Sequence, residues 1–218
     1  MQMVFHFSDM THNAFVKRTF YTFNTWEDRM FKSLLTMVAC VAVVAAQSAA
    51  PAGPTDAQKK LAQESETYCK STASAKADPA TIVKKVKEAC ALLEKDGMKA
   101  FMKFQGDKSP FIFGGTYLVI NDFGGVMMMH PMRPDMNGKN FMELKDKDGK
   151  LFYAEMVKLC KDKGEGWVDF YWPKPGATEP SPKVSYVHKA KCDGKDVVVS
   201  CGVYDMTLAD VQKALPKK

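Results

Sequence analysis

The sequence GTYLVINDFGGVMMMHP, residues 115–131, carries the clearest indication of secondary structure in this chain. Two apolar runs, Thr116–Ile120 and Val126–Met129, flank the five residues NDFGG. Asn, Asp and Gly supply the tight or left-handed backbone geometry of a hairpin turn, and each run is too short for a typical globular helix. We therefore predict a central antiparallel hairpin. Its second arm delivers His130 to the edge of the sheet, because Pro131 cannot continue a ladder of hydrogen bonds.

Helices are expected before this hairpin. Thr55 or Asp56 is suited to cap a first helix that runs to about Ser74. Asp78 followed by proline marks the start of a second helix, and Gly97 is its stop signal. The second helix carries an apolar stripe at helical spacing, formed by Ile82, Val83, Val86, Cys90 and Leu93.

The chain after the hairpin alternates between one helix and several strands. A helix is expected over residues 150–163, and strands over 166–173, 183–191 and 197–204, with a short helix over 208–215. Helices, a hairpin, a helix and three strands predict an α+β fold, an antiparallel sheet flanked by N-terminal helices.

Side chains in two of these strands alternate between faces. In residues 166–173, Trp167 and Tyr171 share one face and Trp172 lies on the other. In residues 183–191, Lys183 and Tyr186 point to opposite faces.

The N-terminal segment is typical of exported proteins. Residues 30–48 hold a basic start, an apolar run and small residues that suit signal peptidase. The run is shorter than the roughly 20 residues of a spanning helix. We predict a periplasmic or secreted protein, with membrane anchoring by an uncleaved N-terminal segment as the alternative. Residues 1–29 lie upstream of the protein if Met30 is the start, and form a disordered or cytoplasmic extension if Met1 is the start.

Composition argues against several classes of protein. The net charge of +6 comes from lysines scattered among acidic residues, and no basic stripe with stacking aromatics indicates nucleic-acid binding. No CxxC, HExxH or other motif with metal-ligand spacing is present. No Gly-x-Ser-x-Gly elbow, phosphate-binding glycine loop or haem attachment motif indicates an enzyme. We therefore expect no enzymatic activity, no metal and no cofactor.

Five cysteines follow the predicted signal peptide: Cys69, Cys90, Cys160, Cys192 and Cys201. An oxidising compartment favours disulfides, but an odd number leaves one thiol free or paired between chains. If residues 193–196 form a turn, Cys201 lies opposite His188. That register puts its sulfur about 13 Å from the sulfur of Cys192, too far for a bond. No connectivity is predicted.

The ordered motifs TYLVINDFGGVMMMHP, NGKNFMELKDKDG, GEGWVDFYWPKPG, SPKVSYV and VSCGVY together resemble the single Cache domain of the sCache_2 type. The resemblance covers about residues 78–205 and implies a PAS-like fold. It also implies an extracytoplasmic sensor, as in chemoreceptors and histidine kinases, that binds small organic acids such as pyruvate, lactate, acetate or propionate. No transmembrane segment follows Tyr204, so the chain is expected to be a free-standing exported member.

The resemblance sets the expected domain organisation. Residues 49–77 form an N-terminal helix, residues 78–206 the single Cache domain, and residues 207–218 a short C-terminal helix and tail. The expected partners are a small organic acid, a membrane receptor or histidine kinase, and a second copy of the chain in a homodimer.

A small carboxylate buried in such a domain needs a fixed cation and neutral hydrogen-bond donors. Lys183 matches the Pro-Lys-x-x-Tyr pattern of the family and is the first candidate for the cation; a solvated lysine is the alternative. His130 is a candidate donor, and a buried histidine bonded to the backbone is the alternative. Arg133 is a candidate for a two-pronged carboxylate contact, with exposure as the alternative.

Aromatic residues complete the predicted ligand site. Tyr117, Tyr171 and Tyr186 offer hydroxyl donors on apolar rings. Trp167 and Trp172 are expected to wall the site and exclude water.

Two functional hypotheses follow. In the first, the protein captures a small acid and presents it to a signalling partner, with lid-like motion of loops Met132–Asn140 and Pro173–Pro182. In the second, it is a structural or interaction module without a functional pocket, which dimerises through exposed Met127–Met129 or an unpaired cysteine.

Overall fold

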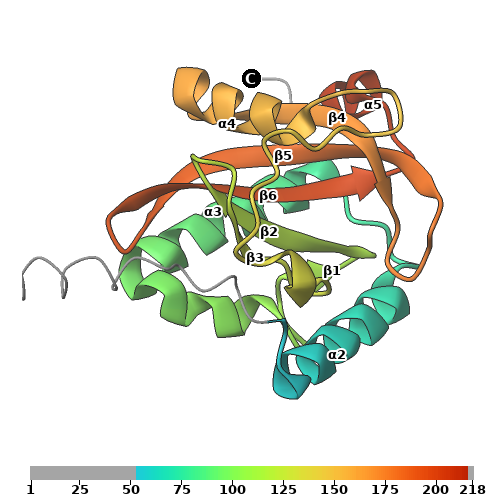
Figure 1. Cartoon of the computed structure of the whole chain (residues 1–218). Coiled ribbons are helices and arrows are strands. Elements are labelled where there is room, and N and C mark those ends of the chain that lie inside the picture. Colours follow the sequence, from blue (N-terminus) through green and yellow to red (C-terminus); the bar gives the residue numbers. More distant parts are fainter. Residues whose placement is uncertain (1–52, 216–218) are drawn as a thin grey trace, which may run out of the picture. The chain divides into compact units, whose positions relative to one another are not determined.

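The computed structural model describes residues 53–215 (Figure 1). The predicted signal peptide, residues 30–48, and the upstream residues 1–29 lie outside the described residues, as does the end of the predicted C-terminal tail.

Six antiparallel strands form one sheet in the described part of the chain. They are β1 (Ile112–Phe113), β2 (Thr116–Asp122), β3 (Met127–Met129), β4 (Glu165–Pro173), β5 (Pro180–Cys192) and β6 (Lys195–Tyr204). Their order is β1-β2-β6-β5-β4, and β3 also pairs with β2. The predicted α+β class with an antiparallel sheet is confirmed.

The hairpin of residues 115–131 forms as expected, but it is not central. Strands β2 and β3 pair antiparallel, and β3 ends at Met129, directly before His130 and Pro131. In the order of strands the middle place is held by β6, with β2 and β5 as its neighbours, and β6 is buried from Val197 to Tyr204. A strand covered on both sides takes a central place.

Local capping signals position the helices. Helix α2 (Asp56–Thr72) begins with a capping box at Thr55, and α3 (Pro79–Asp96) begins where the Asp78 side chain accepts a hydrogen bond from the Thr81 N–H. The short helix α5 (Leu208–Ala214) is capped by Thr207. The remaining helical segments are η1 (Gly97–Phe104), η2 (Pro134–Met136) and α4 (Phe152–Lys163). The predicted starts of α2, α3 and α5 are confirmed.

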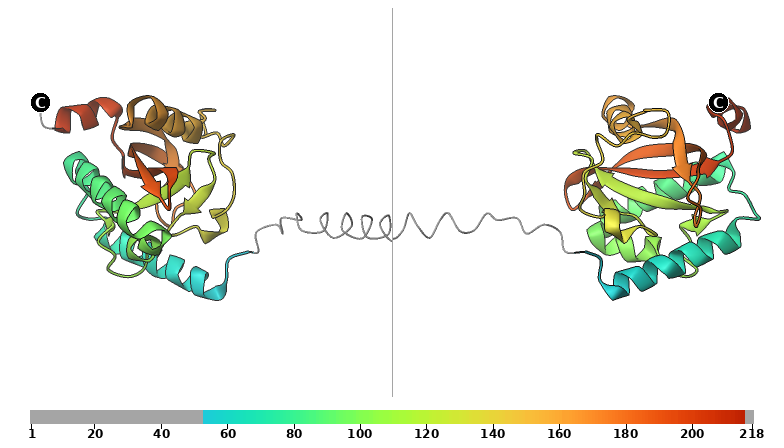
Figure 2. Two further views of the ribbon diagram at one scale, coloured as in Figure 1. Left: turned by 90° about the vertical axis from the view of Figure 1, so that its left-hand side faces the viewer. Right: turned by 45° about the vertical axis from the view of Figure 1, so that its right-hand side comes forward.

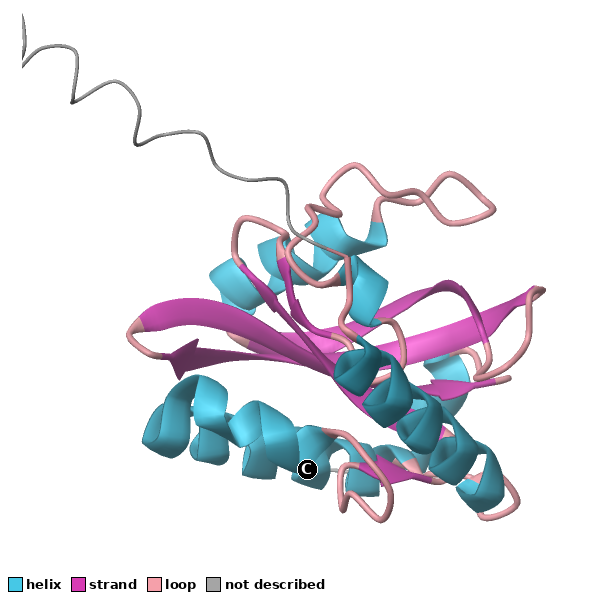
Figure 3. Ribbon diagram, turned by 60° about the horizontal axis from the view of Figure 1, so that its bottom comes forward, coloured by secondary structure: helices cyan, strands magenta, loops and turns pink. Residues whose placement is uncertain are grey.

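Helices cover both faces of the sheet (Figure 3). Helix α3, with η1 and α5, packs on one face and contributes Ile82, Val86 and Leu93 to a first core cluster. Helix α4 packs on the other face, in a second cluster that includes Phe152 and Met156. Helix α2 lies beside β1 at the edge of the sheet (Figure 2). Of the predicted ligand residues, the second cluster holds Tyr117 and Trp172.

The turn between β5 and β6 differs from the prediction. It has two residues, Asp193 and Gly194, since Cys192 pairs with Lys195. Both turn residues have positive φ, 49° and 80°, as a type I′ hairpin turn requires. The expected turn over 193–196 was therefore wrong, and β6 pairs two residues out of the expected register, with Cys201 opposite Tyr186.

All five described cysteines are buried and free. Burial raises the thiol pKa of Cys69, Cys90 and Cys160 to about 12, so these thiols stay protonated and unreactive at neutral pH. The disulfides expected from an oxidising compartment are therefore not found among residues 53–215.

Because the described cysteines are buried and free, they should react with a thiol reagent only after unfolding. N-ethylmaleimide applied to the native protein, followed by peptide mapping, should leave the five described cysteines unlabelled. Labelling after denaturation without a reductant should modify all five. A cysteine that resists labelling until a reductant is added would show a disulfide that the structure lacks.

Candidate functional site

A cavity with so little free volume that we call it the closed cavity lies between the sheet and α4, among residues of the second core cluster. Four of the predicted site residues line it: Tyr117, His130, Trp172 and Lys183. The cavity has a volume of about 20 Å³, which is room for about one water molecule. The structure thus brings four of the eight predicted residues together around one cavity and places the other four elsewhere.

Lys183 is the most unusual member of this site. Its residue is only 5% exposed, and no carboxylate lies within 4 Å of its ammonium in residues 53–215. The ammonium donates to the Tyr204 hydroxyl at 3.2 Å and lies 4.5 Å and 4.6 Å from the ring centroids of Tyr117 and Tyr204. Ring faces attract a cation, but a buried charge without a counter-ion is costly.

His130 is held as a neutral donor. Its Nδ1 accepts hydrogen bonds from the backbone N–H groups of Met132 (3.3 Å) and Arg133 (3.1 Å). Burial, and then the nearby charge of Lys183, lower the pKa of the ring to about 3. Since Nδ1 accepts, the proton of the neutral ring lies on Nε2. The backbone-bonded histidine, one of the two alternatives, is confirmed, and it leaves one N–H to donate.

Tyr153 of α4 adds a hydroxyl that sequence analysis missed. The residue lines the cavity and is buried, and burial raises the pKa of its phenol. The hydroxyl therefore stays protonated, and within the described residues it has no hydrogen-bond partner.

Stacked aromatic rings fix the apolar wall of the cavity. Phe152 of α4 stacks on Phe170 of β4, with ring centroids 4.4 Å apart and planes within 3°. Trp172 packs edge-on against the same phenylalanine at 5.8 Å. These contacts lock α4 to β4 and leave little space for a ligand larger than a few atoms.

Two predicted site residues lie on the opposite face of the sheet. Tyr186 and Trp167 pack against each other, with ring centroids 5.3 Å apart, in the first core cluster. The Tyr186 hydroxyl donates to Glu165 at 2.6 Å. Because neighbouring strand residues point to opposite faces, neither ring can share a cavity with Lys183.

Tyr171 and Arg133 are also placed away from the cavity. Tyr171 alternates with Trp172 and carries the ammonium of Lys147 over its ring at 3.7 Å. Arg133 is exposed and bonds both carboxylate oxygens of Asp135 at 3.0 Å. The alternative of an exposed Arg133 is confirmed, and its guanidinium is already occupied.

Tyr204 is the second residue that sequence analysis missed. It lies directly opposite Lys183 in the β5–β6 pairing. The expected turn over residues 193–196 had placed Lys183 two residues out of this register. The Asp-Gly pair at 193–194 is the signal that reveals the correct register.

No three His, Cys, Asp or Glu side chains gather as a metal site in residues 53–215. None of the helices in the same range combines the length and apolar character that crossing a bilayer requires.

The Cache domain model dCache_2 matches residues 60–215. The match begins inside α2 and ends at the end of the described chain. The matching model is a double-Cache model, so the single-Cache sCache_2 subtype expected from the sequence is not confirmed.

Two curated proteins resemble part of the chain over 88 residues. The methyl-accepting chemotaxis protein McpP of Pseudomonas putida is 40% identical, over 40% of this chain and 16% of its own length. The sensor histidine kinase MctS of Rhizobium johnstonii is 32% identical, over 40% of this chain and 18% of its own length. The chain thus spans less than a fifth of either relative.

A solved structure described as the periplasmic sensor domain of a chemotaxis protein is 30% identical and superposes with a TM-score of 0.52. It covers 59% of this chain and 95% of that structure. The expected α+β fold with an antiparallel sheet is confirmed.

The buried neutral His130 predicts how stability depends on pH. Its folded-state pKa of about 3 lies below the ordinary value of 6.5, so between these values the unfolded chain binds a proton that the native ring does not. The contribution of the neutral His130 ring to the free energy of unfolding is fully present above pH 6.5. It decreases as the pH falls, by up to about 1.4 kcal/mol per pH unit. His130→Asn keeps an acceptor for the backbone but does not titrate. Urea unfolding between pH 6 and pH 4 should therefore show a steeper loss in the wild type, and equal slopes would contradict the buried neutral ring.

Proposed function

The chain belongs to the Cache domain family, and we propose that it is the ligand-binding module of an exported sensor, with a small carboxylate held beside Lys183. Pyruvate, lactate, acetate and propionate are the proposed ligands.

The buried ammonium of Lys183 carries this proposal. A lysine that is 5% exposed, with no carboxylate near it in the described chain, leaves a positive charge without a counter-ion. Charge-assisted hydrogen bonds to a carboxylate are among the strongest that proteins make. An anionic ligand would supply the missing counter-ion, and a neutral ligand would not.

The remaining donors suit the two oxygens of a carboxylate. The Nε2–H of His130 and the hydroxyl of Tyr153 lie on the wall of the same cavity and are unpaired in residues 53–215. Both groups are held in their neutral, donating forms by burial. The stacked rings of Phe152 and Phe170 favour the short apolar tail of a small acid and exclude water.

The volume of the cavity limits the size of the ligand. About 20 Å³ holds roughly one water molecule, so the described conformation is closed even to the smallest of the four acids. Binding therefore requires the wall to open and then to enclose the acid, and this movement couples occupancy to the surface that a partner contacts.

Further features of the proposal concern the whole protein. We propose a membrane receptor or histidine kinase as signalling partner, in line with the relatives McpP and MctS. Export to the periplasm and a single Cache domain complete the proposal. The similarity to a periplasmic sensor domain supports the first, and the one six-stranded sheet within residues 53–215 supports the second.

The second hypothesis, a structural or interaction module, expected dimerisation through exposed Met127–Met129 or an unpaired cysteine, and the structure supports neither contact. Met127 and Met129 are 0% and 2% exposed, so the predicted exposed methionine run is wrong. The described cysteines are buried as well, so neither feature offers a dimerisation surface.

Thermal unfolding with pyruvate, lactate, acetate and propionate tests the proposal. A ligand at 100 times its Kd should stabilise the wild type by about 2.7 kcal/mol and raise Tm by roughly 5–10 °C. Lys183→Met should abolish this shift. It should leave the ligand-free Tm unchanged or higher, because it removes a buried charge without a counter-ion.

Lys191→Met is the matched control, since Lys191 lies on the same strand and is exposed. It should keep the full ligand-induced shift. An unchanged shift in Lys183→Met, or no shift with any of the four acids in the wild type, would contradict the proposal.

A further inference from the structure

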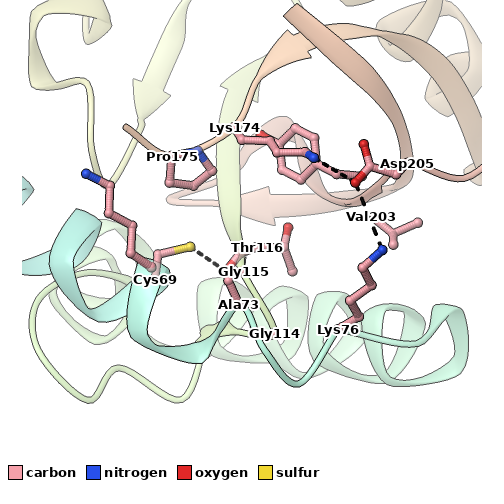
Figure 4. A pocket seen from close by; sticks show the side chains of 12 residues that line it. Cys69, Ala73, Lys76, Gly114, Gly115, Thr116, Lys174, Pro175, Val203 and Asp205 are labelled. Atoms are coloured by element: carbon pink, nitrogen blue, oxygen red, sulfur yellow. Dashed lines mark hydrogen bonds and ion pairs between the residues drawn. The ribbon is translucent and has the colours of Figure 1, made fainter. Parts of the chain in front are cut away.

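A second and larger cavity lies at the ends of β2 and β6, next to α2 and the loop after β4 (Figure 4). Its volume is about 210 Å³, compared with about 20 Å³ for the closed cavity. Its walls include the end of α2 at Cys69 and Ala73, the turn at Gly115, and the loop residue Lys174. This space is large enough for an acid of two to four carbons.

Tyr204 links the larger cavity to Lys183. Its residue lines the larger cavity, and its ring and hydroxyl contact the Lys183 ammonium at the distances given above. The same hydroxyl donates to the carbonyl oxygen of Pro173 at 3.0 Å. The tyrosine thus joins the buried ammonium to Pro173, the last residue of β4, which leads directly into the loop that borders the larger cavity.

We propose that the larger cavity is the access vestibule through which the acid reaches Lys183, with Tyr204 and the loop over residues 174–179 as the gate. The proposal rests on the proposed function, because it names the route to the same carboxylate site.

The loop over residues 174–179 is held by few hydrogen bonds, and its Gly176 packs against the side chain of Lys70. Residues 176–179 are exposed, and the loop has one internal backbone hydrogen bond, from Ala177 to Lys174. Lys174 pairs with Asp205 at 2.7 Å across the mouth of the cavity (Figure 4). An ion pair with both partners about 40% exposed contributes little stability, so displacing this loop breaks little structure.

The other candidate gate is the predicted lid over residues 132–140, which is bound far more firmly. Met132 and Met136 are buried in the second core cluster. The loop is also fixed by backbone hydrogen bonds from Gly138 to Met127 and from Met127 to Lys139, and by the bonds that His130 accepts. Opening this side would expose apolar surface and break several hydrogen bonds, so the 174–179 side opens at lower cost.

Charge at the vestibule favours an anion. Lys70, Lys76 and Lys174 line it; Asp205 pairs with Lys174 and Lys76, and Glu66 of α2 pairs with Lys70 at 2.6 Å, which leaves an excess of one positive charge. Clefts with an excess of one charge raise the association rate of an oppositely charged ligand, and the effect falls as salt increases. Lys76 is exposed and lies 4.0 Å from Asp205, so it can be changed without disturbing packing.

Stopped-flow fluorescence of the full chain with propionate tests the route, and pyruvate, lactate and acetate serve as further probes. Trp172 in the closed cavity is the reporter. Lys76→Glu should lower the association rate constant at least threefold at 20 mM salt, leave the dissociation rate unchanged, and approach the wild-type rate at 0.5 M salt. Lys139→Glu, the same charge reversal on the exposed end of the other loop, should leave both rates unchanged.

A steric block provides a second variant. Ala73→Phe places a ring in the vestibule, away from Lys183, and should slow association and dissociation by the same factor, so that Kd stays constant. Rates unaffected by both Lys76→Glu and Ala73→Phe, or a slower rate in Lys139→Glu, would overturn the vestibule while leaving the carboxylate site intact. Failure of the wild type to bind any of the four acids would overturn both proposals.

Discussion

One buried positive charge governs the architecture of this chain: the ammonium of Lys183, which has aromatic faces and one hydroxyl around it but no carboxylate in the described residues. Cation–π contacts and a single hydrogen bond recover only part of the hydration that such a group loses. The native state therefore carries an electrostatic cost that an anionic ligand can relieve. The Lys183 nitrogen therefore couples binding of an anionic ligand to the stability of the native state.

The rest of the fold supports that charge. Strand β6 lies in the centre of the sheet and places Tyr204 directly across from Lys183. The chain after β3 leaves the sheet at His130, whose Nδ1 is occupied by backbone N–H groups, so that its other nitrogen donates. Helix α4 supplies Tyr153 and closes the space with stacked rings. Each element thus contributes either a donor or a water-excluding surface to one small volume.

How well a feature could be predicted from the sequence depends on how far apart along the chain the interacting residues lie. The starts of α2, α3 and α5 were predicted because a cap and its helix are only a few residues apart. The β5–β6 register was missed because the Asp-Gly turn was not recognised, and with it the pairing of Lys183 with Tyr204. Tyr186 was assigned to the site although its alternation with Lys183 was recognised. Alternation sorts side chains into two faces, but only tertiary packing shows which face holds the cavity.

A crystal structure of the protein with propionate is the most direct test of the carboxylate site. The carboxylate should lie within about 3.2 Å of the Lys183 ammonium, the range of a charge-assisted hydrogen bond, with its second oxygen accepting from Nε2 of His130. The opposite result is propionate bound elsewhere, or a cavity that stays closed with Lys183 still bonded to Tyr204 alone. That outcome would show that this buried lysine is a structural feature and not the counter-ion of a ligand.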